Sequence, residues 1–547
     1  MKLSLKPWYK CLALASLVAP ATMLATPSHA VSTDPSRPNI LVIVMDDLGI
    51  GQLNFNLATL NKNALAQKPQ APRYAADLDK LIAAAEQAMP NISELAAQGV
   101  KMTNAFVAHA VSGPSRAAIF TGKAPGSFGI YGNDDSFSGV PLEQKFLPEL
   151  FQAAGYNTAN IGKFHNARVN RDRSIGRKYI SPELQTRDYH DNWSAIPDKG
   201  FAPQDRGFDF SYSYFASGAA LYNSPAFWRN DKPETSWGYT THNLTKETMD
   251  FIDQSGDKPF YINLAYSVPH IPLEQASPAK YMDKFNTGNV EADKYYASLN
   301  AADEGIGKII AQLKEKNALD NTIIFFLSDN GSVHEAPLPL NGNNSSYKGL
   351  YHNGALNVPF IVYYPRLIPA GSVNDTFISA MDILPTSLRL AGIKIPYNLK
   401  LDGKDIMPVL AGKTKESPHK YLYWAGPGAF HYSEENMPFW SGYWDYITYK
   451  ADKAPNNPNL ERNAKGSWAI RDGEYALIYL NDGSSNPIKL YNEKLDPGYT
   501  KDLAQQMPEK FVELRRAFYQ WLSTQPRPIQ WNPEEFDLML QAAKGDA

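Results

Sequence analysis

The stretch of residues 40–47, ILVIVMDD, decides the fold of this chain. Its first six residues are apolar without interruption, a pattern typical of a strand buried on both faces of a parallel sheet. Asp46 and Asp47 follow at once, and sites in open α/β sheets form outside the carboxyl ends of the strands. The stretch therefore predicts a central strand with a functional site at its carboxyl end.

Further apolar runs along the chain extend this sheet. Residues 260–268 (FYINLAYSV), 322–327 (TIIFFL) and 359–364 (PFIVYY) have the same continuous pattern, and residues 156–161 (YNTANI) form a weaker one. Helical patterns such as residues 299–314 lie between the runs. Strands that alternate with helices predict an α/β fold, with a large domain built on a mostly parallel central sheet flanked by helices.

Polar side chains follow these strands at the points where they end. Besides the aspartate pair, His270 follows the second run, Asp329 and Asn330 follow the third, and Lys163 and His165 follow the weaker one. One such cluster alone would more often be a turn or a cap. Because sites in open α/β sheets form outside the carboxyl ends of the strands, four clusters predict one shared site there.

Residues 112–122, SGPSRAAIFTG, predict a helix with Pro114 in its first turn and Gly122 as its stop. Ser112 would then lie at the helix N-terminus, where free N–H groups and the helix dipole favour an anion. Arg116, one turn further on, could add a charge-assisted hydrogen bond to such an anion. An ordinary capping serine is the alternative interpretation of this stretch taken alone.

The C-terminal part of the chain has a different pattern. Residues 468–480 (WAIRDGEYALIYL) predict a β-hairpin that turns at Asp472 and Gly473, and residues 508–522 predict an amphipathic helix. These segments indicate a smaller C-terminal α+β domain with an antiparallel sheet. We place the α/β domain at residues 31–430 and the C-terminal domain at residues 431–547.

The first thirty residues predict a secretory signal peptide. Lysines precede an apolar run at residues 11–24, and small residues follow it, while the run is too short for a stable membrane anchor. Such a signal suits a bacterial periplasmic or secreted protein. Cys11, the only cysteine, lies within it, so the mature chain can form no disulfide and no thiolate metal site, and it has no cysteine nucleophile.

Composition narrows the possible partners. The 547 residues carry a formal net charge of −3 and contain no extended basic run. This argues against a nucleic-acid partner. The chain is long enough to build a large core and a smaller second unit.

The segment SGPSRAAIFTGK, residues 112–123, resembles the sulfatase signature, in which Cys or Ser is followed by x-Pro-x-Arg and later by Thr-Gly. The resemblance extends over nearly the whole mature chain, through PNILVIVMDDLG, MPNISELAAQGVKMTNAFV, IGKFH, YSVPHIP, LSDNG and LYNEKLDPGYTKDLA. The joint order of these motifs is specific to that family, which belongs to the alkaline phosphatase superfamily. The resemblance implies that Ser112 is oxidised to formylglycine by a sulfatase-maturating radical-SAM enzyme before export.

The implied modification explains why a serine would occupy this position. A plain serine that attacked a sulfate ester would end as a stable serine sulfate. A hydrated aldehyde carries two hydroxyls on one carbon, so one can attack sulfur while deprotonation of the other expels sulfate. The resemblance therefore implies an exported enzyme that hydrolyses sulfate monoesters.

The resemblance also implies a role for each residue of the expected site. One divalent cation, Ca²⁺ or alternatively Mg²⁺, would be bound by Asp46, Asp47, Asp329 and Asn330. All four side chains offer oxygen atoms, which suit these ions better than zinc. Arg116 would orient the formylglycine hydrate, Lys163 would bind sulfate and His165 would deprotonate the second hydroxyl. His270 and Lys348 would face the leaving oxygen.

Three segments depart from the family pattern or add to it. After Lys348, the residues His352, Asn353 and Asn357 stand where the family commonly has Glu-Gly-Gly and an arginine, which points to a different substrate contact. Residues 51–89 form a longer link than usual, either a lid or a surface segment. The aromatic residues at 430–449 could stack on sugar or aryl groups, or could pack in the core.

Two alternatives to a sulfatase stay open at this stage. The first is a phosphonate or phosphate ester hydrolase of the same superfamily, dependent on formylglycine or on serine itself, although Asn330 argues against its two-zinc form. The second is a catalytically inactive protein that binds sulfated glycans. Sulfated saccharides are the expected substrates, with small aryl or alkyl sulfates as the alternative.

Overall fold

The computed structural model describes residues 34–53, 60–66, 77–170, 196–215, 217–271, 273, 275–428, 460–481 and 483–545, with residues 438, 439, 441, 442, 451 and 456. The predicted signal peptide and most of the aromatic stretch 430–449 lie outside the described residues. Within the described part, no helix combines the length and the apolar character needed to span a bilayer.

A ten-stranded sheet forms the centre of the large domain. Its middle strands are parallel to one another, as predicted, and in spatial order they are β11 (Thr322–Ser328), β1 (Asn39–Met45), β10 (Phe260–Ala265), β4 (Asn157–Lys163) and β7 (Phe210–Tyr214). All seven residues of β1 are buried, which is the burial that the run ILVIVM predicts. The α/β class is therefore confirmed.

The two margins of the sheet contain antiparallel pairs. Next to β11 lie β12 (Phe360–Tyr363), β2 (Val100–Met102) and β13 (Ser372–Asn374), of which β12 is antiparallel to both its neighbours. Next to β7 lies a hairpin that the sequence patterns did not reveal, β8 (Tyr222–Arg229) and β9 (Lys232–Tyr239). The parallel core is thus extended on both sides by strands that need no helical crossover.

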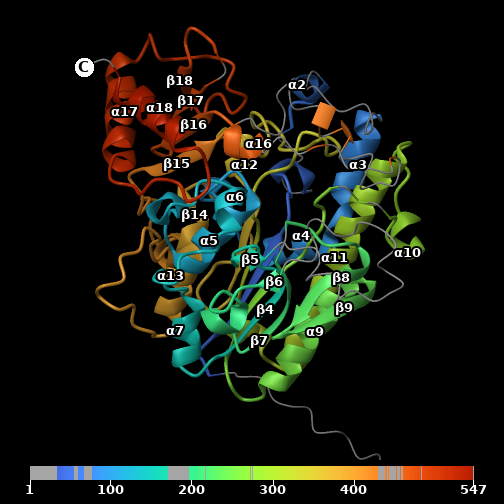
Figure 1. Ribbon diagram of the computed structural model, residues 1–547. Coiled ribbons are helices and arrows are strands. Elements are labelled where there is room, and N and C mark those ends of the chain that lie inside the picture. The colour runs from blue at the N-terminus through green and yellow to red at the C-terminus, as the bar shows by residue number, and fades with distance from the viewer. Residues whose placement is uncertain are drawn as a thin grey trace, which may run out of the picture.

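Helices cover both faces of the sheet (Figure 1). Alternate residues of β1 belong to different cores: Ile40, Val42 and Val44 pack on one face, and Leu41, Ile43 and Met45 on the other. The first face is covered by α5 (Ser112–Thr121), α7 (Pro148–Ala153) and α13 (Ile383–Leu390), and the second by α3 (Leu78–Ala88), α4 (Pro90–Gln98), α9 (Thr240–Ser255) and α11 (Val290–Glu315).

Short elements complete the large domain. They are η1 (Ile50–Gln52), α2 (Lys62–Ala66), β3 (Ala105–Phe106), η3 (Pro125–Phe128), α6 (Asn133–Ser136), β5 (Val169–Asn170), β6 (Ile196–Pro197), η5 (Pro203–Arg206), α10 (Ala279–Met282), η6 (Leu319–Asn321), α12 (Asn353–Leu356), β14 (Ile378–Ser379), η7 (Ala380–Asp382) and α14 (Met407–Leu410). The described parts of the long link at 51–89 form α2 and α3, and Leu65 and Leu81 are buried there. These two helices are part of the core rather than a purely surface segment.

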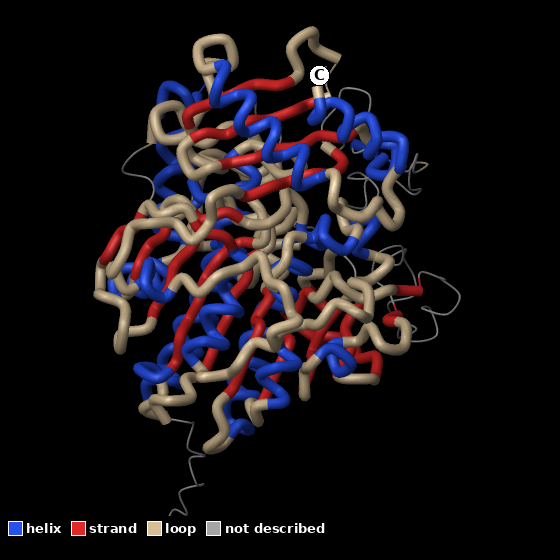
Figure 2. The backbone as a smooth tube through the Cα atoms, turned by 90° about the vertical axis from the view of Figure 1, so that its left-hand side faces the viewer, coloured by secondary structure: helices blue, strands red, loops and turns tan. Residues whose placement is uncertain are grey.

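The smaller C-terminal unit is a four-stranded antiparallel sheet covered by two helices (Figures 1 and 2). Its elements, in chain order, are β15 (Leu422–Pro427), α16 (Leu460–Asn463), β16 (Gly466–Arg471), β17 (Tyr475–Leu480), β18 (Ile488–Asn492), α17 (Pro508–Leu522) and α18 (Pro533–Lys544). The predicted hairpin and amphipathic helix are present, and Phe518 stacks on Trp468 with ring centroids 4.4 Å apart. β15 pairs in this sheet although it precedes the expected boundary at residue 430.

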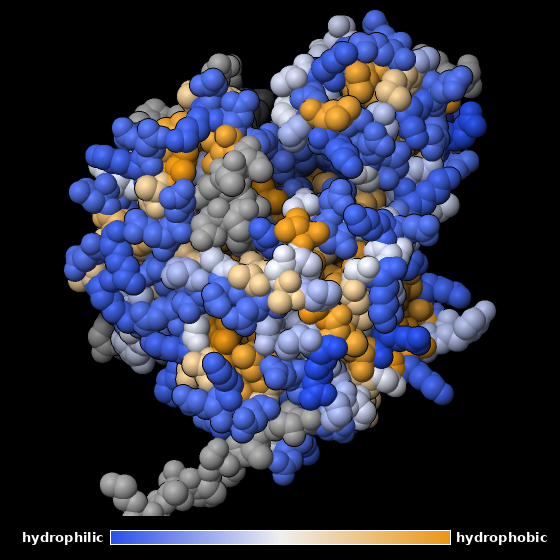
Figure 3. Space-filling model, turned by 180° about the vertical axis from the view of Figure 1, so that it is seen from behind, coloured by the Kyte–Doolittle hydropathy of each residue, from blue (hydrophilic) through white to orange (hydrophobic). Residues whose placement is uncertain are grey.

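The small sheet buries its second face against the large domain. Trp468 and Ile470 of β16 pack beneath α17 and α18, while Ala469 between them joins the core of the large domain. Trp424 of β15 crosses the junction, and its indole N–H donates to Val107 O at 2.8 Å. Seen from behind, the exterior is mainly hydrophilic, with hydrophobic side chains in small groups (Figure 3).

Candidate active site

The parallel strands bring the predicted polar residues to one edge of the sheet. Met45 lies opposite Ser328, so Asp46 and Asp329 leave neighbouring strands at the same level. The backbone ladder continues one step further, since Asp329 N donates to Met45 O at 3.0 Å. Lys163 is the last residue of β4, on the far side of β10 from β1. The clustering expected from the strand ends is therefore present.

Asp47 turns the chain sharply after β1. Its φ is 66°, in the left-handed region that aspartate tolerates better than most residues. Two bonds hold the turn: Asp47 N donates to Asp329 Oδ1 at 3.2 Å, and Leu48 N donates to Ser328 Oγ at 2.8 Å. The residues that follow β11 thus fix the aspartate pair that follows β1.

Ser112 is the first residue of α5 and its side chain points toward the acidic cluster. Ser112 Oγ lies 3.2 Å from Asn330 Oδ1 and 3.4 Å from Asp46 Oδ1. The N-cap position is Val111, with no side-chain capping bond, and Gly122 ends the helix with a φ of 65°. The interpretation of Ser112 as an ordinary capping serine is therefore wrong, whereas the predicted helix end is confirmed.

Three cations compensate the three buried aspartates. Arg116 donates from Nε and pairs through Nη2 with Asp329 Oδ2, at 2.9 and 2.8 Å. Lys163 Nζ lies 3.0 and 2.8 Å from the two carboxylate oxygens of Asp46. Lys348 Nζ, from a loop far along the chain, lies 2.6 Å from Asp47 Oδ1; Asn330 Nδ2 donates to the same oxygen at 2.7 Å. Charges this deeply buried are tolerated only when they are paired in this way.

The ion pairs decide the protonation of the carboxylates. Burial alone would raise the pKa of Asp46, but Lys163, His270 and Arg116 outweigh it and hold the pKa below its usual value. For Asp47 the opposing groups are Lys348 and His270, and the result is again a lowered pKa. Both side chains are therefore anionic at neutral pH and able to bind a cation.

The two predicted histidines differ in their surroundings. His270 Nε2 is 3.6 Å from Asp47 Oδ2, and 26% of its side chain is exposed. Burial lowers the pKa of His270, although Asp47 acts in the opposite direction. His165 is buried two residues beyond Lys163 with a φ of 55°, and its ring centroid lies 4.9 Å from that of Phe137.

The acidic cluster fits a divalent cation. Ligand atoms of Asp46, Asp47 and His270 lie within 4.8 Å of one another. Among the described residues, no hydrogen bond reaches Asp47 Oδ2, although this oxygen is buried. A carboxylate oxygen in that state is suited to a metal, and the neighbouring oxygens of Asp329 and Asn330 are hard ligands. His270 was expected at the leaving group rather than near the ligands, and the geometry brings it close to both aspartates.

The altered residues after Lys348 build the loop that borders the site. Asn353 Oδ1 accepts from Ser345 N at 2.8 Å, and Asn357 Nδ2 donates to Ala105 O at 3.1 Å. The loop packs tightly on the turn after β11, because a Cβ on Gly331 would lie 1.8 Å from Gly354 O. The side chains of these two asparagines hydrogen-bond to backbone groups, so they would influence substrate binding through the shape of the loop.

Three residues beside Ser112 were not singled out from the sequence. The side chains of His109, Asn133 and Asn166 bond to peptide groups next to the serine. Asn133 and Asn166 lie far from Ser112 along the chain, and no spacing or motif connects them with it. Only the tertiary structure shows their position.

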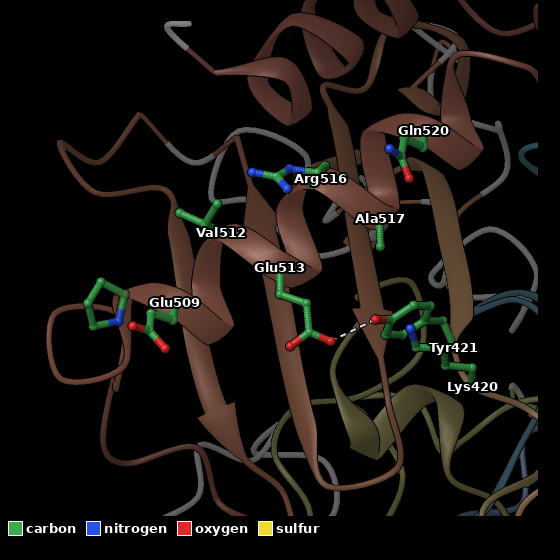
Figure 4. Close-up of a pocket in the computed structure, with 9 residues that line it drawn as sticks. Lys420, Tyr421, Glu509, Val512, Glu513, Arg516, Ala517 and Gln520 are labelled. Carbon is green, nitrogen blue, oxygen red and sulfur yellow. Dashed lines mark hydrogen bonds between the residues drawn. The ribbon is translucent and has the colours of Figure 1, made fainter.

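A groove of about 620 Å³ lies elsewhere, on the C-terminal unit (Figure 4). Tyr421 donates to Glu513 Oε1 at 2.7 Å across it, as the dashed line in Figure 4 shows. None of the predicted site residues is among those that line it, which are Lys420, Tyr421, Pro508, Glu509, Val512, Glu513, Arg516, Ala517 and Gln520. The groove is therefore separate from the candidate active site.

Comparison with known proteins identifies the family. The sulfatase family model matches residues 38–393. The chain is 40% identical over 510 residues to an uncharacterized sulfatase, YdeN, of Escherichia coli, covering 92% of this chain and 89% of that protein. It is 27% identical over 414 residues to human N-acetylgalactosamine-6-sulfatase, covering 71% and 68% of the two chains.

A solved structure shows the same fold over most of its length. The crystal structure of Ps i-CgsB in complex with k-i-k-neocarrahexaose superposes with a TM-score of 0.67 at 25% identity, covering 93% of this chain and 98% of that one. The structure thus combines a mixed α/β fold with a cluster of polar side chains at the carboxyl ends of its parallel strands. The chain belongs to the sulfatase family, whose class of reaction is the hydrolysis of sulfuric esters.

Proposed function

We propose that this protein is an exported sulfatase that removes sulfate from sulfated saccharides, using a formylglycine made from Ser112 and one bound divalent cation. The position of Ser112 Oγ carries the proposal, because it lies 3.2 and 3.4 Å from oxygens of Asn330 and Asp46. A nucleophile at that point is next to the cation ligands and one helical turn from Arg116. Small aryl or alkyl sulfates are the alternative substrates.

The relatives support the choice of a saccharide. The human relative is named for the 6-sulfate of N-acetylgalactosamine, and the structural neighbour was solved with a bound hexaose. The chain spans 89% of the bacterial relative, so no large part of that protein is missing from the comparison. A sulfated sugar is therefore the first substrate class to test.

We assign the cation site to Asp46, Asp47, Asp329 and Asn330. Their oxygen atoms favour Ca²⁺, with Mg²⁺ as the alternative. A cation held there would act as a Lewis acid on a sulfate oxygen and as a template for the nucleophile. Lys163, Lys348 and Arg116 pair with the aspartates, and this concentration of positive charge supports a role for them in binding the sulfate group.

The remaining side chains have roles in binding and proton transfer. Arg116 orients the hydroxyls at residue 112, and Lys163 contributes positive charge toward sulfate. His270 and Lys348 face the leaving oxygen, and one or both protonate it as the ester bond to sulfur breaks. His165 then removes the proton of the second hydroxyl at residue 112, which releases sulfate and restores the aldehyde.

Export and maturation complete the proposal. Residues 1–30 have the features of a secretory signal peptide, which would take the protein to the periplasm or the exterior. A radical-SAM maturase would supply the oxidation of Ser112 before export. The absence of cysteine after residue 11 makes this a serine-type protein.

One experiment tests the nucleophile and the reaction together. Protein is purified from a host with an active serine-type maturase, and the mass of the peptide containing Ser112 is measured; formylglycine lowers it by about two mass units relative to serine. Sulfate release is assayed with a panel of sulfated saccharides and with 4-nitrophenyl sulfate. 4-Nitrophenyl phosphate and a phenylphosphonate ester are assayed in parallel.

The outcomes separate the candidate functions. A shifted peptide together with sulfate release supports the proposal. An unshifted serine with turnover of phosphate or phosphonate esters would favour the hydrolase alternative. Binding of sulfated glycans without any turnover would point to the inactive binding protein.

A further inference from the structure

Three side chains hold backbone groups of the residues that flank Ser112. Gly113 N donates to Asn133 Oδ1 at 3.0 Å, and Gly113 O accepts from Asn166 Nδ2 at 3.0 Å. On the other side, Val111 N donates to His109 Nδ1 at 3.3 Å. First-turn N–H groups have no partner within a helix, and Asn133 supplies one for Gly113 N, directly after the residue that carries the nucleophile.

Close packing brings Asn133 to this position. A Cβ built on Gly113 would lie 2.4 Å from Ser136 Oγ and 3.1 Å from Asn133 Oδ1. Glycine therefore lets α6, which begins at Asn133, approach the first turn of α5 directly. The same short helix is too small to be stable alone, so its place must be set by what it packs against.

The C-terminal unit provides that support. Asp135 is fully buried, and its Oδ1 accepts from the backbone N–H of Trp531 at 3.1 Å and from that of Gln530. Its Oδ2 accepts from Tyr131 N at 2.8 Å. Glu461 of α16 accepts from the backbone N–H of Asn133 itself. Segments that follow residue 460 thus hold both the start and the middle of α6.

A second connection reaches His109 from the same unit. His109 Nε2 lies 3.1 Å from Tyr351 Oη, and Tyr351 O accepts from Arg471 Nη2 at 2.8 Å. Arg471 is fully buried and pairs with Glu493 Oε1 at 2.9 Å. The bond from Gly113 N to Asn133 and the bond from Val111 N to His109 are therefore both supported by the small sheet or the segments next to it.

We propose that Asn133 is a positioning residue for the nucleophile, and that the C-terminal unit acts on the reaction by holding Asn133 in place. The inference rests on the proposed function of Ser112. Among the residues that the structure describes, Asn133 makes no hydrogen bond to the acidic cluster; it acts through Gly113 N. Displacement of a nucleophile by a fraction of an ångström to 1 Å lowers turnover on the order of tenfold to a hundredfold.

The test compares Asn133→Ala with Asn133→Asp in the full-length protein. Asp keeps an oxygen at the position that accepts from Gly113 N, whereas Ala removes it. Asn289→Ala is the matched control, because Asn289 also accepts backbone N–H bonds, from Glu291 and Ala292 at 3.0 and 3.1 Å, but at the N-terminus of α11. Each variant is measured for kcat and KM on the sulfate ester turned over by the wild type, for the mass of the Ser112 peptide, and for hydrogen exchange of residues 110–116.

We expect Asn133→Ala to lower kcat about tenfold or more with little change in KM, to leave formylglycine content unchanged and to speed exchange at residues 110–116. Asn133→Asp should restore most of kcat and of the protection, and Asn289→Ala should keep wild-type kcat. Unchanged exchange at residues 110–116 in Asn133→Ala would overturn the inference even if the wild type proved not to be a sulfatase. An unchanged kcat of Asn133→Ala, measured with an active wild type, would overturn it as well. Absence of formylglycine from both the wild type and Asn133→Ala would instead count against the proposed function.

Discussion

Lys163 donates to both carboxylate oxygens of Asp46, at 3.0 and 2.8 Å, across a strand that separates their own two strands in the sheet. Both side chains are completely buried. The pair therefore links β4 to β1 at the edge where the site lies, and it holds a positive charge beside the expected cation ligands.

Replacement of Lys163 by Met should destabilise the metal-free protein. Asp46 would keep only weaker compensation from His270 and from Arg116, whose Nη2 lies 3.7 Å away. An uncompensated buried charge costs about 3–5 kcal/mol, and we expect a loss of that order in urea denaturation with EDTA. Added Ca²⁺ should reduce the difference from wild type, because the cation would compensate Asp46; an equal loss with and without Ca²⁺ would contradict a cation site at this carboxylate.

Ser112→Ala should abolish turnover and leave the fold intact. The serine contributes two long contacts to Asn330 and Asp46, and alanine is a good helix former at the start of α5. We expect the urea midpoint to change little while sulfate release falls to background. Substantial activity in this variant would rule out residue 112 as the nucleophile.

Removal of divalent cations should inactivate the protein reversibly. Ligand atoms of Asp46, Asp47 and His270 lie within 4.8 Å of one another, and among the described residues no hydrogen bond reaches the buried Asp47 Oδ2. Dialysis against EDTA should abolish sulfate release, and Ca²⁺ or Mg²⁺ should restore it more completely than Zn²⁺. Binding of the cation to the EDTA-treated protein can be measured by calorimetry. Full activity in protein shown to be free of metal would exclude the assigned cation site.

Glu461→Ala should lower kcat, although Glu461 belongs to the C-terminal unit. Its carboxylate accepts from Asn133 N, and burial together with Asp134 raises its pKa well above the usual value. We expect a several-fold lower kcat with an unchanged KM, in the range given for small displacements of a nucleophile. Glu461→Gln, which keeps an oxygen acceptor, should retain most of the activity. Equal kcat values for Glu461→Ala and Glu461→Gln would argue against a role of Glu461 in holding α6.

His109 should make the stability of the protein depend on pH. Burial lowers the pKa of its imidazole to about 4, so it is neutral in the folded protein, whereas the unfolded chain binds a proton below about pH 6.5. Its contribution is therefore complete above pH 6.5 and is lost as the pH falls toward 4, by about 3 kcal/mol in total.

The comparison of wild type with His109→Asn measures this contribution. Between pH 7 and pH 5, the unfolding free energy of the wild type should fall by about 2 kcal/mol more than that of the variant. His352, whose pKa burial lowers to about 3, titrates in both proteins and cancels. Parallel pH profiles would show that folding does not lower the pKa of His109.

The strands and their polar ends could be predicted because they are local features of the sequence. Runs such as ILVIVM and TIIFFL are continuous and apolar, and Asp46, Asp47, Asp329 and Asn330 follow them directly. Parallel strands bring such ends to one edge whatever the details of packing. The hairpin of β8 and β9 escaped detection because its strands are mixed in character and only partly buried.

The sequence by itself determined the α/β class, the strands whose ends carry the site, the helix that begins at Ser112, and the likeness to sulfatases. The tertiary structure decided how the buried charges pair and which side chains hold the nucleophile. Asn133, Asn166 and His109 reach the peptides beside Ser112 through space. Such contacts depend on how distant segments pack. The need for glycine at position 113 follows only from the close packing of α6 against it.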